Sequence, residues 1–205
     1  MLMAWLEKFK AALERIVGGP IAEQVLKDGR PVSTRSSPER KAQWVKGVID
    51  RLDDLVVDEE MRREILLCCS CRFPKRRIRK LKREYQQHGD IDELLRLMHT
   101  DSSWYGWSYY GHPQRAGNVI FVTKIPFSPQ RHESAPNPSA KSRSYCHCGW
   151  IKASKSSISK TFCNCGAGWY KILWEAILEK PVRVEVITSI ASGDTDCTFA
   201  IHLPD

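Results

Sequence analysis

The feature that most constrains this chain is a short cysteine pattern that occurs twice in its last third. The pattern is Cys-x-Cys-Gly with a tryptophan close behind, and its cysteines are Cys146 and Cys148 in the first copy and Cys163 and Cys165 in the second. In an extended strand alternate side chains share one face, so each pair would point in one direction. Two pairs facing each other would bring four thiolates to one point, the arrangement of a closed tetrahedral zinc site.

The alternative to a shared zinc ion is two pairs of packed, inert thiols. The Cys-x-Cys spacing is a less specific zinc signal than Cys-x-x-Cys, and cysteine is among the residues most often buried. A glycine follows the second cysteine of each pair and favours the metal, because it lets backbone N–H groups approach the sulfur atoms. We therefore predict zinc, in a structural role because four sulfur ligands leave no position for water or substrate.

Two of the later cysteines allow other roles. Cys165 precedes the glycine-rich start of a predicted helix, where the helix dipole favours a thiolate. It is the candidate nucleophile if the protein is an enzyme, and His147 is the only base near it in the sequence. Cys197 shares its face of a predicted strand with Phe199 and Ile201, so its spacing alone indicates a core residue.

The remaining cysteines, Cys68, Cys69 and Cys71, have no helical spacing that places all three together. We expect one or two of them in the core; a metal or redox pairing with the later cysteines is the alternative. The sequence contains no apolar run that could cross a bilayer and no signal-peptide core, so we expect a cytoplasmic protein without a membrane partner. In that compartment eight cysteines indicate thiols or metal ligands rather than disulfides.

The positive charge of the chain is concentrated in one segment. The formal net charge is +8, and the segment 72–83 alone contains eight basic residues and no acid. A nucleic-acid-binding protein built around a zinc knuckle is therefore one hypothesis. Aromatic residues stand only at the edges of the segment, as Phe73 and Tyr85. We prefer a solvated helix face and expect no nucleic-acid partner.

Hydrophobic periodicity and capping residues predict an α+β fold. Helical spacing covers most of residues 1–100, with one helix opening at Ser37-Pro38 and another capped by Asp58. Residues 101–205 are predicted to hold a strand at 118–125, a long proline-containing loop at 126–144, a helix near 169–177 and a closing hairpin. We expect these two regions to form one integrated domain, in which the helical half packs on an antiparallel sheet and a long helix.

An aromatic segment lies at the junction between the two regions. Large rings with polar tips suit a ligand pocket, and they suit equally a seal between helices and sheet. The candidate pocket residues are Trp104, Tyr105, Trp107, Tyr109 and Tyr110.

The C-terminal residues carry a resemblance to a known family. Pro-Val-x-Val-Glu begins at Pro181, and Ser-x-x-x-Gly-Asp-x-x-Cys-x-Phe-x-Ile runs from Ser189 to Ile201. This run resembles the end of vinyl-4-reductase-like domains, which are related to haem-NO-binding and transport-particle folds. The resemblance implies a helix-and-sheet sandwich around an apolar ligand pocket and a structural zinc held by cysteines near the end of the domain. It makes Cys197 a candidate ligand, with Cys163 or Cys165 as an earlier one.

This sequence departs from that family at two positions. Ser189 stands where the family leads us to expect a cysteine, and Val186 stands where a carboxylate is expected, with Glu185 one position away. A metal here would therefore have a rearranged ligand set.

The N-terminal half resembles a second group. Residues 51–56, Glu59-Glu60 and the cluster 68–71 are similar to uncharacterised bacterial cytoplasmic proteins, some of them labelled as 2-aminothiazoline-carboxylate hydrolases. This resemblance implies hydrolysis of a C–N bond in a cyclic amidine-like substrate. A zinc ion with only three protein ligands would suit that reaction, because it can activate water.

Our reading is a zinc-binding protein that binds or senses a small apolar or heterocyclic ligand. The hydrolase and the nucleic-acid-binding protein are the alternatives. Catalytic residues stay unassigned, and a homodimer is left open.

Overall fold

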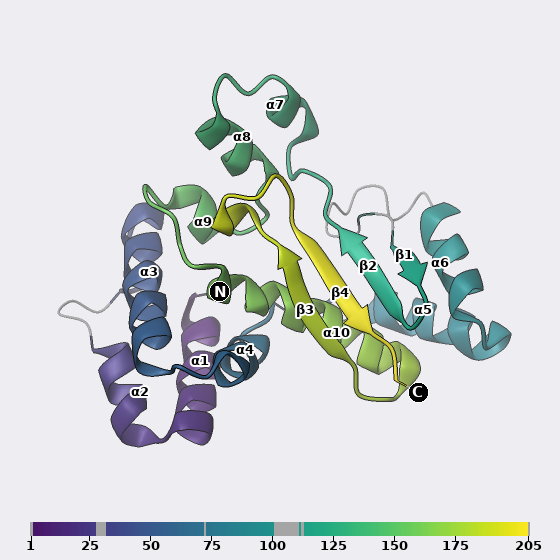
Figure 1. Ribbon diagram of the computed structural model, residues 1–205, viewed down its shortest axis with the longest axis horizontal. Helices are drawn as coiled ribbons and strands as arrows, with labels where there is room; N and C mark the ends of the chain where they lie inside the picture. Colours follow the sequence, from purple (N-terminus) through teal and green to yellow (C-terminus); the bar gives the residue numbers. More distant parts are fainter. Residues whose placement is uncertain (1, 28–31, 72, 101–110, 112, 205) are drawn as a thin grey trace.

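The computed structural model describes residues 2–27, 32–71, 73–100, 111 and 113–204 (Figure 1). It confirms the α+β fold: helices fill the N-terminal half, and a four-stranded antiparallel sheet with a long helix lies in the C-terminal half. The predicted pocket residues Trp104, Tyr105, Trp107, Tyr109 and Tyr110 lie outside the described residues.

The N-terminal helices begin where the sequence predicts caps. The side chain of Ser37 accepts a hydrogen bond from the Arg40 amide at 3.2 Å, and that of Asp58 accepts one from the Met61 amide at 3.0 Å. No helix of the described chain combines the length and the apolar character needed to cross a membrane. The helices are α1 (Leu2–Val17), α2 (Gly19–Leu26), α3 (Pro38–Leu55), α4 (Glu59–Leu67), α5 (Lys75–His88) and α6 (Ile91–Thr100).

The sheet has the strand order β1-β2-β4-β3, and all neighbours are antiparallel. Its register places Ile201 of β4 between Ile120 of β2 and Val184 of β3, which confirms the closing hairpin and the added strand. Strand β1 was not predicted, because it is three residues long and fully exposed and so has no hydrophobic pattern. The strands are β1 (Gln114–Ala116), β2 (Val119–Thr123), β3 (Arg183–Thr188) and β4 (Thr198–His202).

Helix α10 (Asn164–Leu178) lies across one face of this sheet (Figure 1). Its buried side chains Tyr170, Leu173 and Trp174 pack with sheet residues such as Phe199. At Gly168 the helix comes so close to α4 that an added Cβ atom would stand 2.2 Å from the Leu67 carbonyl oxygen. The absence of a side chain at this position allows the two helices to pack.

The buried hydrophobic residues form two clusters. The sheet cluster lies between the sheet, α10, α5 and α6, and includes Leu81, Ile120 and Trp174. The helical cluster lies among α1 to α4 and includes Phe9 and Ile65. Two residues, Cys148 and Ile151, pack against both clusters, so the first cysteine pair lies near their boundary.

The segment 126–144 is not the long loop that its prolines predict. It contains α7 (Pro129–Glu133) and α8 (Pro138–Tyr145), each with proline in its first turn, where the missing N–H has no helical partner to lose. The side chain of Asn137 caps α8 by accepting from the Ala140 amide at 2.9 Å. A short helix, α9 (Gly149–Ala153), follows, and single 3₁₀ turns occupy η2 (Lys160–Cys163) and η3 (Ile190–Ser192).

Candidate metal centre

The first cysteine pair is extended, as predicted, and the second is not. Cys146 and Cys148 have β-region backbone angles between α8 and α9. Cys163 has helical angles at the end of η2, and Cys165 lies in the first turn of α10. Because helical residues are turned by roughly 100° each, side chains two apart point to different sides. The expectation that this pair shares one face was wrong, since the helix begins at Asn164 and not after the glycines.

Cys163 points toward the turn that precedes β4. Its sulfur lies 3.0 Å from the hydroxyl of the buried residue Ser189, and that hydroxyl accepts from the Ala191 amide at 3.1 Å. The sulfur of Cys197 accepts from the Ile190 amide at 3.5 Å in the same turn. Burial raises the pKa of Cys163 to about 12, the hydroxyl of Ser189 opposes this rise, and repulsion from Cys197 adds to it.

Ser189 occupies the position where the resemblance leads us to expect a cysteine. The structure places it beside Cys163, and the same turn holds Cys197. This turn therefore brings two thiols and a hydroxyl together, with Ser189 beside Cys163.

Cys165 points toward α4 and the residues after it. Burial raises its pKa well above the ordinary value, and repulsion from Cys148, Cys163, Cys69 and Cys71 raises it further. The segment 68–71 thus comes near enough to Cys165 to interact with it electrostatically, while a metal or redox pairing with the later cysteines stays a prediction. No spacing in the chain signals this proximity, because it depends on α4 packing against α10.

Cys148 belongs to a group of interacting cysteines, called here the cysteine cluster, whose other members are Cys71, Cys146, Cys163, Cys165 and Cys197. Burial is the largest cause of its raised pKa, and repulsion from Cys71 adds to the rise. Cys148 in turn raises the pKa values of Cys146, Cys163 and Cys165. Cys146 is buried and has its pKa raised to about 12, by burial and then by repulsion from Cys148, Cys163 and Cys197. Cysteines from distant segments of the chain therefore lie close enough to raise one another's pKa values.

Two residues of the segment 68–71 have other contacts. The sulfur of Cys68 accepts a hydrogen bond from the Arg15 guanidinium at 3.5 Å, on the exposed side of α1. Cys69 is buried, donates to the Ile65 carbonyl at 3.4 Å and has a raised pKa through burial. Cys71 is exposed, and its charge raises the pKa of Cys148 and Cys165.

Lys124 brings positive charge to the thiols, a role that no sequence pattern indicates. Its Nζ atom lies 4.8 Å from the centre of the Phe199 ring and would be 3.6 Å from a Cβ atom added at Gly166. Its charge lowers the pKa of Cys148, Cys163 and Cys197 against the larger effect of burial. A lysine at the end of a predicted strand is common, so only the fold identifies it.

The predicted nucleophile and base each have a shifted pKa. Burial, followed by the neighbouring cysteines, raises the pKa of Cys165 well above its ordinary value, which does not favour the thiolate. The Nε2 atom of His147 donates to the Ile125 carbonyl at 2.8 Å, and its ring packs edge-on against Phe127. Burial lowers the pKa of His147 to about 4.

The sulfur atoms are gathered but do not already form a closed site. In the part of the chain that the structure describes, no three His, Cys, Asp or Glu side chains have an arrangement that holds a metal ion. The donors themselves, several thiols, are of a type that suits zinc.

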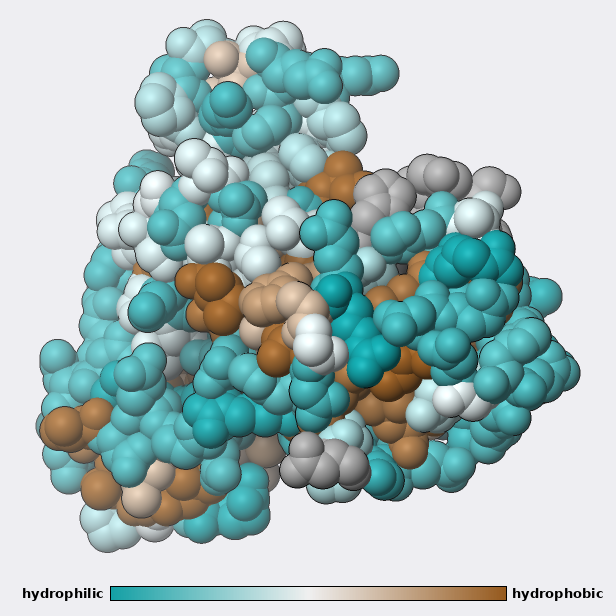
Figure 2. Space-filling model, turned by 45° about the vertical axis from the view of Figure 1, so that its right-hand side comes forward, coloured by the Kyte–Doolittle hydropathy of each residue, from teal (hydrophilic) through white to brown (hydrophobic). Residues whose placement is uncertain are grey.

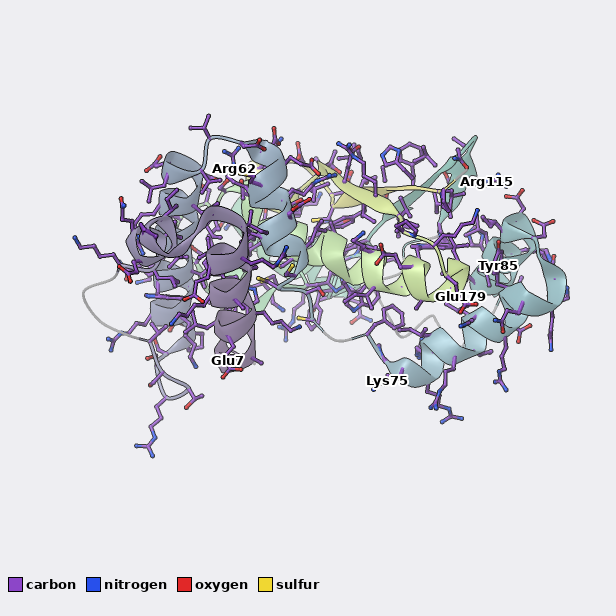
Figure 3. The ribbon with its side chains drawn as sticks, turned by 90° about the horizontal axis from the view of Figure 1, so that it is seen from below. Glu7, Arg62, Lys75, Tyr85, Arg115 and Glu179 are labelled. Carbon is purple, nitrogen blue, oxygen red and sulfur yellow. The ribbon has the colours of Figure 1, made fainter. Side chains whose placement is uncertain are left out.

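The basic segment forms α5 and exposes most of its charge. Lys75, Arg76, Arg79 and Arg83 are exposed, while Leu81 is buried. Figure 3 shows Glu179 at the end of α10 close to α5, where its carboxylate lies 2.7 Å from the Lys82 ammonium.

Replacing three arginines of α5 tests whether this face has a role beyond solvation. The variant Arg76→Gln/Arg79→Gln/Arg83→Gln is expected to keep its thermal midpoint within a few degrees, because exposed substitutions change stability by about 0.5 kcal/mol or less each. Circular dichroism melts would measure this. A steeply salt-dependent affinity of the unchanged protein for RNA or DNA that disappears in the variant would instead favour the nucleic-acid hypothesis.

Comparison with known proteins adds one match. Residues 141–205 match the model of a family described as a family of unknown function (DUF6144). No curated protein matches the chain, and neither does any solved structure. The matched segment includes Cys146, Cys148, Cys163, Cys165 and Cys197 and excludes the segment 68–71. The chain is thus similar to this family over its later cysteines, α10 and the hairpin β3-β4.

Proposed function

We propose that this protein binds one zinc ion through its clustered thiols and uses it to hold together a module that binds or senses a small ligand. The observation that carries the proposal is that the fold brings both motifs together: Cys148 packs against both hydrophobic clusters, Cys165 packs against the helical cluster, and the sulfur of Cys163 lies 3.0 Å from the hydroxyl of Ser189. These three sulfurs come from the two Cys-x-Cys-Gly motifs. Cys71 or Cys146 supplies the fourth ligand. Both lie near Cys148, because Cys71 raises the pKa of Cys148 and Cys148 raises the pKa of Cys146.

Charge balance supports this assignment. A zinc(II) ion with four thiolates carries an excess of two negative charges, which is costly to bury without compensation. Lys124 supplies a positive charge among these sulfurs, as its effect on the pKa of Cys148 and Cys163 indicates. The ion itself would supply a cross-link between segments, and the raised pKa values mean that protons must leave as it binds.

The ligand count separates the sensor from the hydrolase. Four sulfur ligands leave the ion closed and structural, whereas three with a water would leave it able to activate that water for hydrolysis of a C–N bond. X-ray absorption at the zinc edge distinguishes four sulfur neighbours from three sulfurs and an oxygen. We favour the closed site and a cytoplasmic setting, in which the cysteines stay reduced. The ligand we favour is a small apolar or heterocyclic molecule.

Elemental analysis tests the proposal. Protein purified under reducing conditions is expected to contain about one zinc per chain, the stoichiometry of a closed four-sulfur site. Cys165→Ser is expected to lose more affinity than the 10- to 100-fold that changes around a zinc site typically cause. Cys68→Ser is the matched control and should keep its zinc, because Cys68 faces Arg15. Absence of metal, or equal zinc in both variants, would remove the proposal.

A further inference from the structure

A surface pocket separate from the cysteines has the character of an anion site. It has a volume of about 420 Å³ and lies against α7, α8 and α9, and its charged lining residues are Arg131, Arg143 and Lys152, with no acid among them. A pocket of this volume suits a small organic molecule. We propose that it binds a small phosphate ester through the phosphate group.

The two guanidinium groups are the main recognition elements. Within the described chain neither Arg131 nor Arg143 forms an ion pair with a carboxylate, so both are available to a ligand. Guanidinium groups bind phosphate through two parallel hydrogen bonds, which carboxylate-free surroundings strengthen. Lys152 completes the set, and its Nζ atom stands 3.7 Å from the centre of the Phe127 ring, which holds it at the pocket wall.

A hydroxyl group adds a neutral donor. Three serines line the pocket, and two of them already donate their hydroxyls: Ser134 to the Gln130 carbonyl at 2.8 Å and Ser144 to the Lys141 carbonyl at 2.7 Å. The hydroxyl of Ser128 has no partner in the described part of the chain. It can therefore donate to a phosphate oxygen without breaking an existing bond.

Backbone hydrogen bonds hold the walls of the pocket in place. The amide of Phe127 donates to the Tyr145 carbonyl at 3.0 Å, and the amide of Ser128 donates to the Ser144 carbonyl at 3.0 Å. These bonds join the start of α7 to the end of α8. The lobe that the two helices form, at the top of Figures 1 and 2, has a mostly hydrophilic surface. The recess itself combines these cations and serines with apolar side chains such as Phe127 and Pro136, so it suits a charged group that carries a small organic part.

A small ester fits the arrangement better than a polymer. The cations surround one recess, whereas a nucleic-acid backbone requires positive charges spread along a track, such as the face of α5. The volume also leaves room for an organic group of a few atoms beside the phosphate.

Titration calorimetry with three probes tests the proposal: inorganic phosphate, glycerol 3-phosphate and glycerol. We expect the ester to bind and glycerol not to bind. In Arg131→Gln/Arg143→Gln the affinity for the ester should fall at least about 10-fold, since each charge-assisted hydrogen bond contributes substantially. Both arginines are exposed, so the variant should fold, and the α5 variant Arg76→Gln/Arg79→Gln/Arg83→Gln is the control that should bind normally.

Three outcomes would overturn the inference. They are no binding of the ester at millimolar concentration, equal affinity in the double variant, and binding of glycerol as tight as that of the ester. Tighter binding of the ester than of inorganic phosphate supports an ester site. Equal binding of the two means that the pocket is a site for free phosphate. The double variant should keep its zinc. Failure of the phosphate-ester proposal therefore shows in the ester affinity, whereas failure of the zinc proposal shows in the zinc content.

Discussion

Replacing Gly168 with alanine is expected to lower the free energy of unfolding by about 3 kcal/mol, near the upper end of what overpacking costs. The added Cβ atom would stand 2.2 Å from the carbonyl oxygen of Leu67 and 2.9 Å from its carbon. Both are backbone atoms, so no rotation of a side chain can relieve the contact. Helices α4 and α10 must move apart, and contacts of both hydrophobic clusters are lost with them.

Gly149 provides the matched control for this substitution. A Cβ atom at Gly149 meets nothing within 4 Å, and the residue opens α9 with ordinary helical geometry. Gly149→Ala is therefore expected to change stability by less than about 1 kcal/mol. Urea unfolding followed by tryptophan fluorescence measures both variants. If the two substitutions cost the same, the close approach of α4 and α10 does not govern the stability of this protein.

Lowering the pH from 6.5 toward 4 is expected to destabilise the protein through His147. Burial lowers the pKa of this histidine to about 4, whereas an unfolded chain has it near the ordinary 6.5. Below 6.5 the unfolded state binds the proton and the folded state does not, so stability falls as the pH falls through this window. The shift corresponds to a loss of at most about 3 kcal/mol, since one pKa unit is equivalent to about 1.4 kcal/mol.

The variant His147→Gln isolates this effect. Glutamine keeps an N–H donor for the Ile125 carbonyl but does not titrate, and the cysteines on either side are unchanged. Any loss of zinc in acid should therefore lower the stability of both proteins. A further loss of stability in the wild type alone is then caused by protonation of His147. Urea midpoints at pH 7, 5.5 and 4.5 give the comparison. Parallel curves for the two proteins would contradict the expectation.

The sequence predicts those parts of the fold that depend on residues close together in the chain. Ser37 and Asp58 cap α3 and α4 as their residue types indicate. A continuous apolar run identifies β2, and alternation of apolar residues identifies β3 and β4. Pro129 and Pro138 misled the prediction, because proline is as well suited to the first turn of a helix as to a loop.

The candidate site was only partly predictable, because its composition depends on helix packing. The repeated motif identifies its sulfurs, but whether Cys163 and Cys165 share a face depends on where α10 begins. Cys71 and Lys124 come near the later cysteines through contacts between distant segments, and no local pattern signals such contacts.

The position of the cysteines at the boundary of the two hydrophobic clusters has a consequence for how the protein responds to chemical attack. Cys146 and Cys197 belong to the sheet cluster, Cys69 belongs to the helical cluster, and Cys148 packs against both. Separation of the N-terminal helices from the sheet would uncover sulfur on both surfaces at once. Alkylation of buried thiols from both clusters at one common rate is therefore the expected sign of such a separation, whereas different rates indicate local openings.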